Sequence, residues 1–221
     1  MAQPFPRFIM PTSRYEDERG NRLPSVTQIL GLVWSKPALI GWAHSEGLRG
    51  RPLNKTRDDA AVAGTAAHEL ILSRIGGDPP ILDSYNEAAL KEARISDHHA
   101  VSWIDEHEFE PVLVEQPLVS SKLGFGGTPD WYGLLDGVPT VLDIKTSKRV
   151  YPDHFVQAAA YAMLLKEAGH KVQVLAVLQS PRAIKGQANH FTKTGSEMID
   201  PFTRGFELAL ELYNLRNMIG Y

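Results

Sequence analysis

The feature that most constrains the fold is an Asp-Gly pair at positions 136–137. It separates the apolar run Trp-Tyr-Gly-Leu-Leu from the run Val-Pro-Thr-Val-Leu-Asp-Ile-Lys. An Asp-Gly pair between two hydrophobic runs is typical of a two-residue β-hairpin turn. Counting outward from this turn places Asp130, the end of a Gly-Thr-Pro-Asp strand at 127–130, directly opposite Asp143. The sequence therefore predicts an antiparallel hairpin with two facing carboxylates.

These carboxylates predict a site for divalent metal ions. Asp143 and Lys145 are two positions apart and share one face of their strand, whereas Leu142 and Ile144 point into a core. Carboxylates that face each other across a ladder repel, and a cation between them removes the repulsion. Mg²⁺ typically binds one or two protein carboxylates together with substrate phosphates, and a nearby lysine adds positive charge for a water or phosphoryl oxygen. Solvated surface charges are the alternative interpretation of these residues.

The composition is that of a soluble globular protein. The chain has 221 residues, 43% hydrophobic and 22% charged, which predicts one α/β domain over 1–221, divided into an N-terminal arm with helices (1–57) and a core (58–221). The sequence has no cysteine, which excludes disulfides, thiolate zinc sites and cysteine-ligated iron–sulfur clusters. We expect a cytoplasmic protein without a membrane partner, because no apolar run approaches spanning length and no signal-peptide pattern opens the chain. The net charge of −3 means that contact with phosphates would need a local positive groove.

The N-terminal part is predicted to be an irregular arm followed by helices. Residues 1–24 contain four prolines and a short hairpin near Asn21. A capping box at 25–28 opens a helix to about Trp34, and Pro37 begins a second helix to about Leu48. The segment 47–57 is expected to be a loop, either solvated or facing phosphates. Its basic residues are Arg49, Arg51, Lys55 and Arg57.

The next helix is predicted to run from Asp58 to a stop at Gly76-Gly77. Within it, Gly64 precedes His68 by one turn, and His68 shares the apolar face of the helix. From its position alone, His68 is more typical of a hydrogen-bonded core histidine than of a ligand. Glu69 points elsewhere and is expected to be solvated.

A second capping box at 84–87 predicts a helix to about Glu108, followed by a strand over 111–120. Glu115 in this strand is either a carboxylate behind the metal site or an ordinary edge charge. After the hairpin, Lys148 and Arg149 form a basic exit from the strand.

The C-terminal part is predicted to alternate helices and strands. Pro152 begins a helix that ends at Gly169, and Gln157 and Tyr161 share one of its faces, either as a surface pair or as part of the site. Two further strands are expected. The remaining predicted elements are strands over 172–178 and 187–193 and a helix from Asp200-Pro201 to about Met218.

Four short motifs occur in a characteristic order. They are Gly64-x-x-x-His68, Gly127-Thr-Pro-Asp130, Asp143-Ile-Lys145 and Gln157-x-x-x-Tyr161. Together they resemble the PD-(D/E)xK nuclease superfamily, and within it the RecB-like exonuclease branch of phage recombination exonucleases and the mitochondrial genome maintenance exonuclease. The resemblance spans about 64–161.

This resemblance implies a restriction-endonuclease-like α/β core, a central mixed β-sheet flanked by helices, here with an N-terminal helical elaboration. By position, Asp130 and Asp143 look like the metal-binding carboxylates, His68 like the additional metal ligand, and Lys145 like the catalytic lysine. The implied cofactor is Mg²⁺ or Mn²⁺, without an iron–sulfur cluster.

The resemblance also implies a substrate. Gln157 and Tyr161 look like the motif that helps to hold the DNA and the active site, and Lys148 and Arg149 are candidate phosphate contacts. The implied activity is exonucleolytic hydrolysis of linear DNA in recombination, repair or replication of phage or mobile DNA, with a single-strand annealing or binding protein as a candidate partner. The alternatives are a restriction- or repair-type endonuclease and a non-catalytic nucleic-acid-binding relative.

Overall fold

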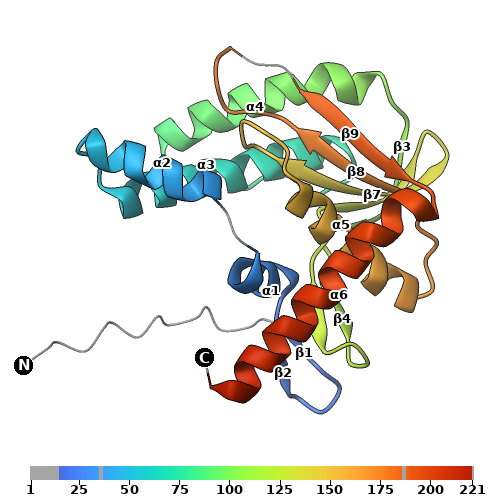
Figure 1. Ribbon diagram of the computed structural model, residues 1–221. Coiled ribbons are helices and arrows are strands. Elements are labelled where there is room, and N and C mark those ends of the chain that lie inside the picture. The colour runs from blue at the N-terminus through green and yellow to red at the C-terminus, as the bar shows by residue number, and fades with distance from the viewer. Residues whose placement is uncertain (1–14, 35–36, 186–187, 221) are drawn as a thin grey trace, which may run out of the picture.

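The computed structural model, which describes residues 15–34, 37–185 and 188–220, is an α/β fold around a mixed five-stranded sheet (Figure 1). In spatial order the strands are β3 (Phe109–Val114), β6 (Trp131–Leu135), β7 (Val138–Lys145), β8 (Val174–Gln179) and β9 (Asn189–Thr194). β7 and β8 are parallel, and the other neighbours are antiparallel. The predicted fold class is therefore confirmed. None of the helices within the described ranges has the length and hydropathy that a membrane crossing needs.

The hairpin predicted from the Asp-Gly pair joins β6 and β7. Asp136 and Gly137 have φ of 51° and 76°, the left-handed conformation that a tight hairpin turn requires at both positions. The register runs from Leu135–Val138 to Trp131–Leu142, as counted from the sequence. The strand begins at Trp131, however, and not at position 127, so Asp130 lies one residue beyond the last ladder pair.

Helices cover both faces of the sheet (Figure 1). On one face lie α5 (Pro152–Glu167) and α6 (Ser196–Ile219), and on the other α3 (Leu53–Arg74) and α4 (Glu87–Asp105). Because β7 and β8 are buried on both sides, their sequences are almost continuously apolar. Val141 faces α5, whereas Leu142 and Ile144 face α3 and α4, as the alternation of side chains predicts.

The N-terminal elements follow the predictions closely. A hairpin of β1 (Tyr15–Glu16) and β2 (Arg22–Leu23) turns before Asn21. The capping box at Ser25 opens α1 (Val26–Val33), and α2 (Pro37–Leu48) follows. Residues 1–14, the start of the predicted irregular arm, lie outside the described residues.

The predicted loop over 47–57 is wrong in its second half, because α3 begins at Leu53 rather than at Asp58. Asp58 has the sequence pattern of a helix cap, but the helix is already preceded by Pro52, which has an extended backbone and occupies the cap position. In the short loop, Arg49 and Arg51 bind the buried carboxylate of Glu46 at 2.9 and 3.4 Å. These two arginines therefore stabilise the loop through their ion pairs with Glu46.

Three further element boundaries differ from the predictions. Ser84 belongs to a 3₁₀ turn, η1 (Leu82–Ser84), and the cap of α4 is Asn86, whose side chain accepts the N–H of Ala89. The strand predicted over 111–120 is interrupted at Glu115, which has φ of 48°. Its second part, β4 (Leu118–Ser120), pairs with β5 (Phe125–Gly127) in a separate small sheet.

The C-terminal helix starts earlier than predicted. Gly195, with φ of 69°, ends β9 and precedes the first turn of α6, so Pro201 lies inside the helix instead of opening it. Helix α5 begins at Pro152 and is followed by Gly169 at φ of 91°, as predicted. Gln187, the predicted start of the last strand, lies outside the described residues.

Candidate active site

The candidate site lies where β7 ends beside β8. Asp143 and Lys145 project from β7 toward α5, on the same face as Val141. Asp143 is fully buried, and Lys145 is mostly buried, with 19% of its side chain exposed. The alternative of two solvated surface charges is therefore excluded.

Lys145 and Asp143 form a close ion pair. The ammonium nitrogen lies 2.9 Å from Oδ1 and 2.7 Å from Oδ2 of Asp143, but only the contact with Oδ1 has hydrogen-bond geometry. Oδ2 is consequently a buried oxygen without a hydrogen-bond donor among the described residues. Burial raises the pKa of Asp143 to about 7, with the Asp130 carboxylate adding to the rise and Lys145 opposing it. A buried carboxylate with an unsatisfied oxygen is a group that a cation would stabilise.

Asp130 is anchored to the same strand by a backbone hydrogen bond. Its Oδ2 accepts the N–H of Ile144 at 2.7 Å, just beyond the last ladder pair, Trp131–Leu142. The charge of Asp130 acts on Asp143 near the end of β7, although Asp130 is not a ladder partner of Asp143. Asp130 keeps 17% of its side chain exposed and is the more accessible of the two.

His68 reaches this carboxylate from α3, on the opposite face of the sheet. Its Nδ1 lies 3.7 Å from Oδ2 of Asp130. Burial lowers the pKa of His68, although Asp130 opposes the effect, so the imidazole is neutral at neutral pH and keeps a lone pair on one ring nitrogen. Gly64, one turn earlier, faces Thr146, and a Cβ there would make only an ordinary 3.4 Å contact with Thr146 Oγ1.

Gln157 and Tyr161 connect the lysine to the interior of α5. Gln157 Oε1 accepts from Lys145 Nζ at 3.3 Å, and Gln157 Nε2 donates to the Tyr161 hydroxyl at 2.8 Å. Tyr161 is only 4% exposed and packs against Gly127. The interpretation of a helix surface pair is thus wrong, and the two side chains lie behind Lys145.

Glu115 lies near Asp130, and Glu69 lies near Glu115. Glu115 donates its backbone N–H to the carbonyl of Asp130 at 3.1 Å. Burial raises the pKa of Glu115, and the charges of Asp130 and Glu69 add to the rise, so Glu115 is not an isolated edge charge. The prediction that Glu69 is merely solvated is wrong, because its carboxylate accepts from the Tyr85 hydroxyl and from the N–H of Ile81.

Lys148 and Arg149 are exposed in the segment that joins β7 to α5. This segment is held by a residue that sequence reasoning missed. Gln179, at the end of β8 and in register with Lys145, donates Nε2 to the carbonyl of Ser147 at 3.0 Å. A polar residue at the end of the apolar run Val-Leu-Ala-Val-Leu is the signal that could have indicated it.

The candidate metal ligands are Asp130, Asp143 and His68. No group of three His, Asp or Glu side chains within the described ranges is arranged as a ready metal site. The pair Asp130 and Asp143 nevertheless fits the mode in which Mg²⁺ binds one or two carboxylates and completes its shell with water and substrate phosphates. The unsatisfied Oδ2 of Asp143 supports this fit.

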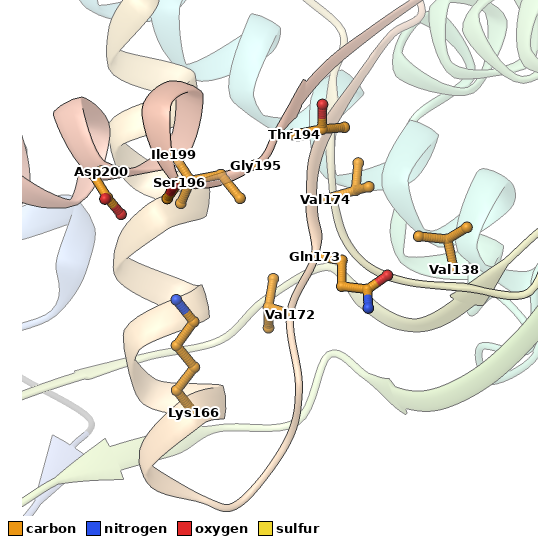
Figure 2. Close-up of a pocket in the computed structure, with 10 residues that line it drawn as sticks. All are labelled: Val138, Lys166, Val172, Gln173, Val174, Thr194, Gly195, Ser196, Ile199 and Asp200. Atoms are coloured by element: carbon orange, nitrogen blue, oxygen red, sulfur yellow. The ribbon is translucent and has the colours of Figure 1, made fainter.

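A hollow lies at the other end of the sheet. It has a volume of about 530 Å³ and starts at Val138, seven residues before Lys145 on β7. Figure 2 shows Lys166 of α5 and Asp200 of α6 at its wall, with Val172 between strand and helix. Seven residues of extended strand correspond to roughly 23 Å, so this hollow is separate from the candidate site.

Comparisons with known proteins do not assign a function to the chain, so the functional assignment depends on the geometry of the site. No protein-family model matches the chain, and no curated protein is significantly similar to it in sequence. Several solved structures are similar, among them the three that follow. LHK-Exo in complex with dAMP has 15% identity and a TM-score of 0.37, covering 89% of this chain and 93% of its own. A candidate exonuclease from Eubacterium rectale has 12% identity and a TM-score of 0.42, with coverage of 85% and 70%. The alkaline exonuclease LHK-Exo from Laribacter hongkongensis has 16% identity and a TM-score of 0.32, with coverage of 69% and 83%. At TM-scores this low, the similarities carry no argument.

Proposed function

We propose that the protein is a divalent-metal-dependent deoxyribonuclease that hydrolyses phosphodiester bonds from DNA ends. The observation that carries the proposal is Asp143, a fully buried carboxylate with an unsatisfied oxygen, next to Lys145 and close to Asp130. A chain keeps such an arrangement at a cost in stability, and perturbed carboxylates of this kind cluster at functional sites.

Asp130 and Asp143 would hold Mg²⁺ or Mn²⁺, with His68 as a neutral imidazole beside Asp130. A divalent cation at this position supplies Lewis-acid stabilisation of phosphate charge and lowers the pKa of a water molecule. Imidazole nitrogen suits Mn²⁺ better than Mg²⁺, so Mn²⁺ should support activity at least as well as Mg²⁺.

Lys145 would supply positive charge while the phosphate gains negative charge in the transition state. Burial alone would lower its pKa, but Asp143 and Asp130 outweigh burial, and the pKa of Lys145 lies above its ordinary value. The ammonium is therefore charged at neutral pH and is unsuited to act as a general base. Its hydrogen bonds to Asp143 and Gln157 hold the charge in one place, which is what electrostatic stabilisation requires.

Lys148 and Arg149 would contact the phosphates that follow the reacting one. Both are exposed directly after β7, within a chain whose net charge is −3. Helices α3 and α5 approach the site from the two faces of the sheet through His68 and Gln157. A strand that enters from an end would fit between two such helices more easily than the middle of a duplex would. This arrangement favours exonuclease action over the restriction- or repair-type alternative.

The test uses end-labelled linear duplex DNA and covalently closed duplex circles, each incubated with Mg²⁺, with Mn²⁺ or with EDTA. We expect short products from the linear DNA, intact circles, no reaction in EDTA and slower digestion as salt rises, because phosphate contacts release counterions. An Asp143→Ala preparation controls for contaminating nucleases and should be inert. Linearised circles would change the assignment to endonuclease, and no cleavage of either substrate by wild-type protein would leave only a nucleic-acid-binding role.

A further inference from the structure

The N-terminal hairpin brings a tyrosine to the segment that carries Asp130. Tyr15, the first residue of β1, is 6% exposed, and its hydroxyl lies 2.7 Å from Oγ1 of Thr128, 113 positions later in the chain. The same region is joined by backbone contacts, since Gly126 donates its N–H to the carbonyl of Pro24 at 3.0 Å. Tyr15 lies outside 64–161, the stretch that carries the resemblance to nucleases.

Gly126 makes this contact possible, and Gly127 makes room for Tyr161 on the other side of the strand. A Cβ at Gly126 would lie 2.4 Å from Cγ of Tyr15, and a Cβ at Gly127 would lie 2.8 Å from Cε1 of Tyr161. Consecutive residues of an extended chain face opposite sides, so the two rings lie on opposite sides of β5. Thr128 faces the same side as Gly126, which explains how the ring of Tyr15 covers the glycine while its hydroxyl reaches the threonine.

The hydrogen bond to Thr128 acts on Asp130 through a stiff connection. Pro129 has a fixed φ, and the residue before a proline is confined to extended conformations, so few rotatable bonds separate the Thr128 backbone from Asp130. Asp130 has two further anchors, the Glu115 N–H on its carbonyl and the Ile144 N–H on its carboxylate. Fixing Thr128 therefore fixes the direction from which the Asp130 side chain leaves the chain.

We infer that Tyr15 is a positioning residue for Asp130. Through its hydrogen bond to Thr128, it holds the carboxylate where it can bind a divalent cation together with Asp143. The inference rests on the proposed role of Asp130 as a metal ligand, and it assigns the N-terminal hairpin a function in the site.

The test compares Tyr15→Phe, Thr128→Val and the double variant with Tyr132→Phe as a matched control. Tyr132 is also 6% exposed, and its hydroxyl also makes a 2.7 Å hydrogen bond, but to the carbonyl of Lys171, away from the segment before Asp130. Two readouts are used: the Mn²⁺ concentration that gives half-maximal cleavage, and the amide hydrogen exchange of Ile144, whose N–H binds the Asp130 carboxylate.

We expect Tyr15→Phe to raise the half-maximal Mn²⁺ concentration roughly 3- to 10-fold, the loss expected for one neutral hydrogen bond, with turnover at saturating Mn²⁺ within about twofold of wild type. Exchange at Ile144 should accelerate, whereas exchange at Leu142 should not. The double variant should be no worse than either single variant, since both remove the same hydrogen bond. Tyr132→Phe should leave both readouts unchanged.

The inference is overturned if Tyr15→Phe and Tyr132→Phe have the same metal dependence and the same exchange at Ile144. A lower melting temperature and a lower turnover of Tyr15→Phe, without a change in metal dependence, would also overturn it. That result is expected of a residue with a purely structural role. If wild-type protein neither binds Mn²⁺ nor cleaves DNA, the proposed function fails, and exchange at Ile144 still shows whether Tyr15 positions Asp130.

Discussion

Replacing Asp143 by asparagine should abolish activity and yet stabilise the protein in the absence of metal. Asp143 is fully buried, and one of its oxygens has no hydrogen-bond donor among the described residues. Its pKa is raised from 3.8 to about 7, first by burial and then by Asp130. Asparagine has nearly the same shape but no charge. It removes the cost of holding an anion there, a cost that the raised pKa gives net of the opposing attraction to Lys145.

The size of the effect follows from the pKa. At 1.36 kcal/mol per pH unit, the difference between 3.8 and about 7 corresponds to roughly 4 kcal/mol when Asp143 is fully ionised. The pKa of Asp143 is higher in the folded than in the unfolded chain. The stability that protonated Asp143 gives the folded state is therefore fully present below about pH 4 and is lost as the pH rises through about 7. At about pH 5.5 the remaining difference between wild type and Asp143→Asn is roughly 2 kcal/mol.

The assay is thermal unfolding of both proteins in EDTA at about pH 8 and about pH 5.5. For a chain of this size we expect Asp143→Asn to melt roughly 8–16 °C above wild type at the higher pH and about half as far above it at the lower pH. Adding Mn²⁺ should raise the melting temperature of wild type only, since the variant lacks a ligand. An equal or lower melting temperature of Asp143→Asn at pH 8, or a difference independent of pH, would refute the reasoning.

Asp97 provides a matched control, for which the same substitution should change the stability in the opposite direction. It is also a buried carboxylate beside a base, but both of its oxygens accept from Arg74, at 2.6 and 2.7 Å. Asp97→Asn should therefore destabilise the protein by about 1.5–3 kcal/mol, the value of a hydrogen bond to a charged group. The contrast separates an unsatisfied carboxylate from a merely buried one.

Three further predictions concern single residues. Lys145→Ala should lower kcat by about 10²- to 10³-fold and leave DNA and metal binding largely intact, measured by single-turnover cleavage and by titration; equal losses of rate and binding would make Lys145 a plain phosphate contact. His68→Ala should weaken Mn²⁺ more than Mg²⁺ in activity titrations, and an unchanged response to Mn²⁺ would make His68 only a core histidine. Asp136→Asn should lower the melting temperature at neutral pH, because the Glu108 N–H and then His107 lower the pKa of Asp136; the difference should shrink as the pH falls below about 3.8 and disappear once the pH has passed the lowered pKa. A pH-independent difference would contradict that last assignment.

The parts of the fold that the sequence predicted are those with local causes. The turn at 136–137 depends only on two residues that tolerate positive φ, and the register follows from it by counting. The capping box at Ser25 is likewise complete within four residues. The faces of β7 follow from alternation alone, which is why Asp143 and Lys145 were expected on one side.

The parts that failed depend on contacts between distant residues. Position 115 lies within an apolar, strand-like sequence, but its N–H binds the carbonyl of Asp130, and the strand breaks there. Ser84 satisfies a capping pattern, yet the helix starts at Asn86 because Ser84 is used in a preceding turn. Tyr15 had no local signal, and only the adjacent glycines at 126–127 indicate that something must pack closely there.

The chemistry of the site is itself a consequence of topology. In isolation, Asp143 and Lys145 on alternate positions of a strand would be solvated. Parallel pairing of β7 with β8 makes β7 a central strand, and α5 covers the face from which both side chains project. The face is largely shielded from water. Among the described residues, the groups beside the two charges are each other, the Gln157 amide behind the lysine, and the partly exposed carboxylate of Asp130. Burial in the central strand is thus what gives Asp143 its raised pKa and, under the proposed function, what makes a cation beside it favourable. A hairpin at the edge of the sheet with the same sequence would have neither property.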